Sequence, residues 1–104
     1  MITFIESSIF AKLLPNYLAD DDYRVLQIFL IANPEAGKII PGSGGVRKLR
    51  WSVVGRGKRG GMRVIYYLKS KNGEIWLLTL YSKSRLENIP GHILKQLKEA
   101  FEDE

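Results

Sequence analysis

The side chains best suited to chemistry in this sequence are lysines, arginines and tyrosines, and they gather in its middle. Between Glu35 and Glu74 there is no acidic residue, yet this interval holds ten of the sixteen Lys and Arg residues: Lys38, Arg47, Lys48, Arg50, Arg56, Lys58, Arg59, Arg63, Lys69 and Lys71. Such segregation produces a one-sided positive field, which favours a polyanion, and nucleic acid above all, as the partner. A basic surface that serves only solubility is the alternative.

These residue types have the means to cut RNA without a metal ion. The reaction removes the 2′-hydroxyl proton, neutralises a phosphorane-like transition state and protonates the leaving 5′-oxygen. Histidine commonly moves such protons, but His92 is the only histidine, lies outside the basic interval and is expected to be an exposed or capping residue. Lysine and tyrosine remain, because neighbouring cations lower their pKa and make a neutral lysine or an ionised tyrosine more accessible.

Strand alternation decides which of these side chains share a surface. Over residues 62–69, one face carries Arg63, Ile65, Tyr67 and Lys69, and the other face is apolar. Over the next strand, Ile75, Leu77, Thr79 and Tyr81 alternate with Trp76, Leu78 and Leu80. We expect Arg63 and Lys83 to flank a shallow cleft, with Tyr67 or Tyr81 placed to stack on a base. The alternative is that the tyrosines belong to the core and the cations are merely solvated.

Several familiar sites are excluded or disfavoured. The glycines of "GKRGG" and "GSGGVR" lead into strands rather than helices and lack the residues of the usual nucleotide-binding loops. The run 20–22 of three aspartates is better explained as the start of a helix than as a cation site. With no cysteine and one histidine, we expect no metal and no cofactor.

The elements that must position these residues follow the order β-α-α-β-β-β-α, an α+β fold in a single domain over residues 1–104. Strands are expected at 2–7, 46–53, 62–69 and 74–81. A first helix begins near Ser7 or Ser8 and is interrupted at Pro15, a second runs from the aspartates to Asn33, and a third begins at Pro90. Residues 34–45 are expected to form a loop, and Asn72-Gly73 a hairpin turn.

Composition places the chain among soluble globular proteins, with 45% hydrophobic and 26% charged residues. No apolar run is long enough to cross a membrane, and the N-terminal residues do not resemble a signal peptide. The expected location is the cytoplasm, with no membrane partner.

Taken in order, "GGVRKLRW", "GKRGGMRVIYY", "LLTLYSKS" and "ILKQLKEAF" resemble the RelE/HigB-type toxins of bacterial type II toxin–antitoxin systems. The resemblance covers most of the chain and is closest to the HigB-like branch, because of the basic loop "GRGKRGG". It implies a ribosome-dependent mRNA endoribonuclease, or mRNA interferase, that cuts messages in the A site. It also implies a cognate antitoxin with a helix-turn-helix domain, through which alone the toxin would meet operator DNA.

The resemblance also implies roles for individual residues. Arg63, in the strand pattern x-R-[VIL]-[VIL]-Y, would stabilise the transition state. Lys48, Lys58, Lys83 and Tyr81 would complete the catalytic set. Contacts to RNA would come from Arg47, Arg50, Arg56, Arg59, Tyr67 and Arg85.

Two departures from the family pattern leave alternatives open. Many relatives have an acid soon after the lysine that corresponds to Lys83, whereas Ser84 and Arg85 follow it here, and no His or Glu base occurs between Gly37 and Gly73. A lysine-based mechanism is then the default. The same fold includes ParE-like proteins that poison gyrase without cutting RNA, and a plain nucleic-acid-binding module is the third possibility.

Overall fold

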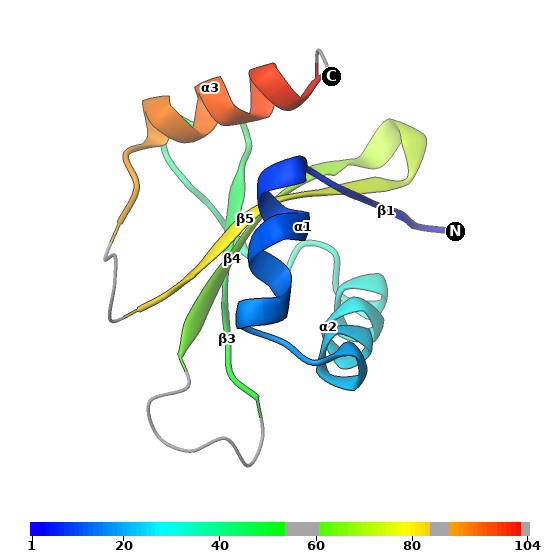
Figure 1. The fold of residues 1–104 in the computed structure, drawn as a ribbon. Coiled ribbons are helices and arrows are strands. Elements are labelled where there is room, and N and C mark those ends of the chain that lie inside the picture. Colours follow the sequence, from blue (N-terminus) through cyan, green and yellow to red (C-terminus); the bar gives the residue numbers. More distant parts are fainter. Residues whose placement is uncertain (54–60, 84–87, 103–104) are drawn as a thin grey trace.

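The computed structural model describes residues 1–53, 61–83 and 88–102, which form an α+β fold (Figure 1). Its strands are β1 (Thr3–Glu6), β2 (Lys38–Ile39), β3 (Arg47–Trp51), β4 (Met62–Lys69) and β5 (Glu74–Ser82). Its helices are α1 (Ser8–Leu13), α2 (Asp20–Ala32) and α3 (Gly91–Glu102), with short 3-10 turns at Leu14–Asn16 and Ser70–Asn72. In the part of the chain that is described, no helix is long and apolar enough to span a bilayer.

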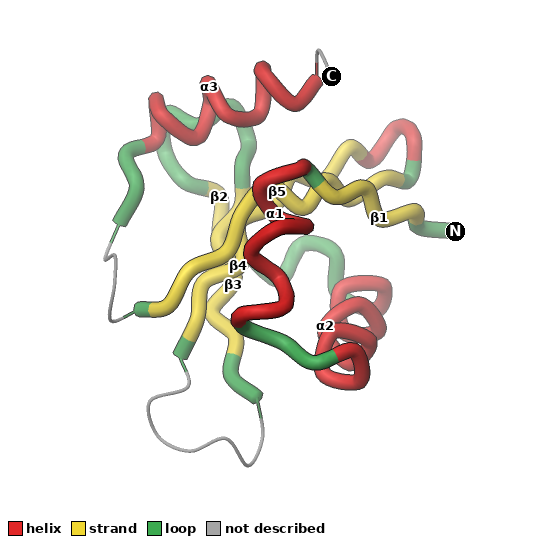
Figure 2. The backbone as a smooth tube through the Cα atoms, in the orientation of Figure 1, coloured by secondary structure: helices red, strands yellow, loops and turns green. Residues whose placement is uncertain are grey.

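All five strands belong to one sheet in the order β1-β5-β4-β3-β2 (Figure 2). The N-terminal strand β1 lies parallel to β5, and the remaining neighbours are antiparallel. The expected order of elements is confirmed except for β2, because Lys38 and Ile39 were expected within a loop. This strand has only two residues and exists through its pairing with Lys48 and Arg47 of β3, which proline and glycine patterns do not reveal.

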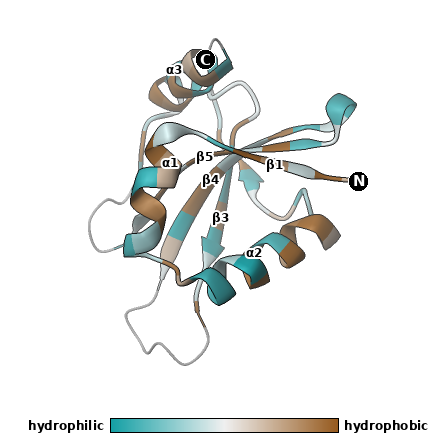
Figure 3. Cartoon of the chain, turned by 45° about the vertical axis from the view of Figure 1, so that its right-hand side comes forward, coloured by the Kyte–Doolittle hydropathy of each residue, from teal (hydrophilic) through white to brown (hydrophobic). Residues whose placement is uncertain are grey.

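Local sequence signals explain where the helices begin and end. The Ser7 hydroxyl accepts a hydrogen bond from the Phe10 amide at 3.0 Å and donates one to the Leu78 carbonyl at 2.7 Å, so it both caps α1 and fixes it to β5. Pro15 ends α1 in a 3-10 turn, as expected. Three aspartates open α2, where the helix dipole favours negative charge, and the rest of the helix is mainly apolar (Figure 3).

The two faces of the sheet carry separate apolar cores. The first core lies under α1 and α2 and includes Phe10, Leu18, Leu26, Leu30, Leu49, Met62, Val64, Tyr66, Ile75, Leu77 and Leu80. The second core lies under α3 and includes Val46, Ile65, Trp76, Leu78, Tyr81 and Leu94. In Figure 1, α3 accordingly lies apart from the other two helices.

A bulge in β5 changes which side chains share a face. Ile65 pairs with Thr79, but the next residue of β4, Tyr66, pairs with Leu77, so Leu78 is the extra residue. Strict alternation placed Leu77 and Tyr81 on the same face, and this expectation is wrong: Leu77 belongs to the first core and Tyr81 to the second. The bulge therefore brings Tyr81 to the face that carries the cations.

Candidate nucleic-acid interface

The strands align three of the expected site residues across the sheet. Arg50 of β3 pairs with Arg63 of β4, and Arg63 pairs in turn with Tyr81 of β5. Directly opposed residues in a sheet project from the same face, so the two guanidinium groups and the phenol form a row on the α3 side. Like charges placed opposite each other destabilise a sheet, and an anion between Arg50 and Arg63 would relieve their repulsion.

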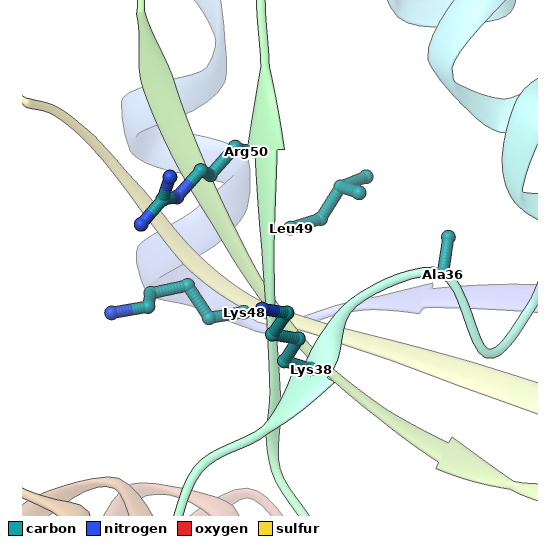
Figure 4. A pocket seen from close by; sticks show the side chains of 5 residues that line it. All are labelled: Ala36, Lys38, Lys48, Leu49 and Arg50. Carbon is teal, nitrogen blue, oxygen red and sulfur yellow. The ribbon is translucent and has the colours of Figure 1, made fainter.

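Alternation along β3 separates cations from core. Figure 4 shows the Lys48 and Arg50 side chains on one side of the strand and Leu49 on the other. Leu49 is 7% exposed in the first core, whereas Arg50 is exposed. Lys38 of β2 pairs with Lys48 of β3, and both line a hollow of about 240 Å³.

A larger cleft of about 390 Å³ opens where β2 and β3 meet the segment before α3. Its polar lining is Lys38, Lys48, Arg50, Tyr81 and Asn88, and its apolar lining is Ile39, Ile40, Pro41, Ile89 and Leu94. No acid occurs among these residues. Cations beside apolar walls suit a nucleotide, since phosphate binds the charges and a base can lie against the apolar side chains.

Arg63 and Lys83 lie where β4 begins and β5 ends, around Gly61. The Lys83 amide donates to the Gly61 carbonyl at 3.1 Å. A Cβ added to Gly61 would lie 4.0 Å from Arg63 Nη1 and 4.0 Å from Lys83 Cβ, so the two cationic side chains flank this glycine. Neither residue belongs to the lining of the two hollows described above, so the expectation that Arg63 and Lys83 flank a shallow cleft stays a prediction.

Tyr81 is a buried wall of the cleft and has only 7% of its surface exposed. Burial raises the pKa of its hydroxyl above the usual value, and the nearby Arg63 charge lowers it only in part. The expectation that surrounding cations make an ionised tyrosine accessible is therefore wrong for Tyr81. At neutral pH its hydroxyl is available as a hydrogen-bond donor.

Two expected RNA-binding residues are engaged elsewhere in the fold. The Arg47 guanidinium, on the opposite face of β3 from Lys48, donates to the carbonyls of Glu35 at 3.2 Å and Gly37 at 2.8 Å. The centroid of the Tyr67 ring lies 5.3 Å from that of Trp76. Nζ of Lys98 in α3 lies 4.5 Å from the centroid of the Tyr67 ring. Arg47 thus fixes the loop after α2, and Tyr67 packs between the sheet and α3.

Four further site residues, Arg56, Lys58, Arg59 and Arg85, lie outside the described residues. Across the ranges that are described, no group of three or more His, Cys, Asp or Glu side chains could hold a metal ion.

Sequence reasoning missed two polar residues of the cleft, Lys38 and Asn88. Lys38 belongs to the acid-free interval, and its inclusion there was the available signal. Asn88 gave none, because it reaches the cleft only through the path of the chain between β5 and α3. Its amide oxygen accepts a hydrogen bond from Lys48 Nζ at 2.9 Å.

Comparison with known proteins gives the same fold. No family model matches the sequence. Among solved structures, a doubly substituted variant of the E. coli toxin RelE in the free state superposes with a TM-score of 0.57 at 10% sequence identity. The match covers 98% of this chain and 95% of that one. At this identity the similarity establishes that the chain has a RelE-like fold.

Proposed function

We propose that this chain is the toxin of a type II toxin–antitoxin module and acts as a ribosome-dependent mRNA endoribonuclease. The observation that carries the proposal is the row Arg50–Arg63–Tyr81 beside Lys48, on the fold of a protein described as a toxin. The ordered motifs that resemble RelE/HigB-type toxins support it independently. Assignment to the HigB-like branch stays a prediction.

In the proposed reaction the RNA supplies the nucleophile. Its 2′-oxygen loses a proton and attacks the adjacent phosphorus, the bond from phosphorus to the 5′-oxygen breaks, and that oxygen gains a proton. Arg63 stabilises the charge that develops on the phosphoryl oxygens. Lys48 and Arg50 hold the message backbone, and the neutral Tyr81 hydroxyl donates a hydrogen bond to the reacting phosphate.

Proton transfer is assigned to lysines. Lys48 lies on the cationic face, which is the face of the sheet that carries Arg50 and Arg63. Lys83 follows β5 beside Gly61, and Lys58 belongs to the basic loop that the resemblance singles out. A protonated lysine can donate the proton that the leaving 5′-oxygen gains, and a neutral lysine can accept the proton of the 2′-hydroxyl. Neither the proposed chemistry nor the resemblance requires a metal ion or an organic cofactor.

The proposed partners follow from the site. Message and ribosome would meet the cationic face, with the ribosome supplying the order that a shallow, solvent-open cleft lacks. A cognate antitoxin would neutralise the toxin and link it to operator DNA through a helix-turn-helix domain. The proposed setting is the bacterial cytoplasm.

The test is cleavage of a defined message by the purified protein, alone and on ribosomes with an empty A site, with cuts mapped by primer extension. We expect cuts only on the ribosome. Arg24, an exposed arginine of α2, supplies the control: Arg24→Ala should cut as the wild type does. A folded protein that makes no cuts in either sample would overturn the proposal, and a supercoiling assay would then test gyrase poisoning.

A further inference from the structure

One hydrogen bond joins the two walls of the cleft. The Lys48 ammonium of β3 donates to Asn88 Oδ1 at 2.9 Å, although the residues are separated by forty positions in the chain. Asn88 precedes α3 in a segment that packs over the edge of the sheet, and both residues line the cleft of about 390 Å³. No other described side chain of this segment supplies a polar contact to the cations of β3.

The segment that carries Asn88 is well anchored. Its neighbour Ile89 packs against the second core. The Pro90 carbonyl accepts hydrogen bonds from the amides of Ile93 at 3.1 Å and Leu94 at 3.2 Å, which ties the segment to the first turn of α3. Gly91 lies so close to the Pro41 carbonyl that a Cβ would not fit between them. The residues that directly follow Asn88 are thus held against the second core and the loop after β2.

An amide suits this position better than a carboxylate. The lysine ammonium stands at the end of a flexible four-carbon stem, so without a hydrogen-bond partner it samples many positions. Ordering it on the substrate then costs conformational entropy. A carboxylate would order it too, but would neutralise the charge that the phosphate needs. The amide oxygen orders the ammonium and leaves its charge available.

We propose that Asn88 is a positioning residue: it holds the Lys48 ammonium over the cleft so that a message phosphate meets a cation already in place. This inference rests on the proposed function and adds to it the residue that organises one of its cations. Asn88 acts through Lys48 and needs no contact of its own with the reacting atoms.

The first test compares Asn88→Ala and Asn88→Asp with Asn16→Ala, which truncates an exposed asparagine of the 3-10 turn after α1. On programmed ribosomes we expect kcat/KM for Asn88→Ala to fall about 10- to 100-fold, because the Lys48 ammonium then has to be ordered each time a message phosphate binds. Asn88→Asp, similar in shape but charged, should fall at least as far. Both should melt within about 2 °C of the wild type. If Asn88→Asp kept full activity, the proposal would be overturned.

A double-mutant cycle separates positioning from other roles. If Asn88 acts only through Lys48, then Asn88→Ala should change kcat/KM less than about twofold in a Lys48→Ala background. If the two substitutions instead multiply their separate effects, Asn88 acts independently of Lys48 and the inference is wrong.

A measurement without substrate distinguishes failure of the inference from failure of the proposed function. The side-chain ¹⁵N relaxation of Lys48 should show a more ordered ammonium than that of Lys12, an exposed lysine of α1, and Asn88→Ala should abolish the difference. Equal mobility of the Lys48 and Lys12 ammonium groups in the wild type would refute the positioning of Lys48 by Asn88, even if the protein cuts RNA. An ordered Lys48 in a protein that makes no cuts would refute the proposed function alone.

Discussion

The two faces of the sheet are built from the same strands and do different work. Under α1 and α2, the side chains of β3, β4 and β5 are mainly apolar, and Val64 and Leu77 have no exposed surface. The apolar set under α3 is smaller, and the same face also carries Lys48, Arg50 and Arg63. One sheet can therefore serve as core on one face and as a charged surface on the other.

The difference shows how the cations are kept in place without being buried. Arg63 stands between Met62 and Val64, both of which point into the first core, so a slip of β4 by one residue would turn the Arg63 side chain into that core. The apolar face fixes the register, and the register fixes the row of charges. Substitutions on the two faces should then affect different properties.

The largest effect on stability is expected in the first core, under α1 and α2. Phe10→Ala removes a fully buried ring from the first core and should lower the free energy of unfolding by about 3–5 kcal/mol. Urea denaturation measures the loss, and Ser8→Ala, at an exposed position of α1, should stay within about 0.5 kcal/mol of the wild type. An unchanged midpoint for Phe10→Ala would contradict the description of the first core.

Arg63→Ala should produce the reverse pattern. We expect cleavage on programmed ribosomes to fall about 10²- to 10³-fold, since the guanidinium is proposed to stabilise charge in the transition state. The urea midpoint should change little, because Arg63 contributes to neither core. A variant that cuts normally would remove Arg63 from the site, whereas one that fails to fold would show that the two faces are not separable.

Arg50 and Arg47 sharpen the comparison, because they lie on the same strand but on opposite faces. Arg50→Ala should weaken binding to a short single-stranded RNA and reduce the slope of log K against log salt by about 0.7, the share of one phosphate contact. Arg47→Ala should leave the slope unchanged and lower the melting temperature by a few degrees, since it loses hydrogen bonds to the Glu35 and Gly37 carbonyls. Fluorescence anisotropy across a salt series measures the slopes. Equal slopes for the two variants would show that Arg50 makes no phosphate contact.

The smallest effect at working pH involves the tyrosines of both faces. Burial raises the pKa of the Tyr66 hydroxyl in the first core and of the Tyr81 hydroxyl in the second, so both groups favour the neutral form in the folded state. Their contribution to stability is complete below the unfolded pKa of about 10 and is lost as the pH rises through the folded values. We expect the free energy of unfolding to fall above about pH 10, as followed by circular dichroism. For Tyr66→Phe or Tyr81→Phe this fall should be shallower, and an unchanged pH dependence would contradict the raised pKa of that residue.

Sequence reasoning succeeded where a signal is local. Ser7 caps a helix because its hydroxyl reaches an amide three residues later, Pro15 interrupts the helix through its own ring, and Gly73 takes a left-handed φ of 65° at the turn before β5. Alternation over residues 62–69 also separated Arg63 correctly from the apolar face of its strand. These features depend on residues within a few positions of one another.

It failed where distant segments decide. The strand β2 exists through its pairing with β3, and the bulge at Leu78 arises between β4 and β5, so neither has a signature of its own. Tyr67 is an aromatic residue of the kind that stacks on bases, yet its ring packs against Trp76 and lies beside Lys98 of α3. Asn88 enters the site through a contact with a residue forty positions away. The candidate cations were therefore predictable as a set, but their arrangement around the cleft was not.

The parallel pairing of β1 with β5 has a consequence for synthesis of the chain. Thr3 pairs with Glu74 and Glu6 with Leu77, so β1 leaves the ribosome about seventy residues before the strand it pairs with. At about 5–20 residues per second, the delay is roughly 4–14 s. During that time the hydroxyl of Ser7, which caps α1, lacks its acceptor, the Leu78 carbonyl of β5, and the first core is incomplete. The apolar residues of α1 and α2 are thus open to chaperones, or to any protein that recognises the unfinished chain, before the cationic face has assembled.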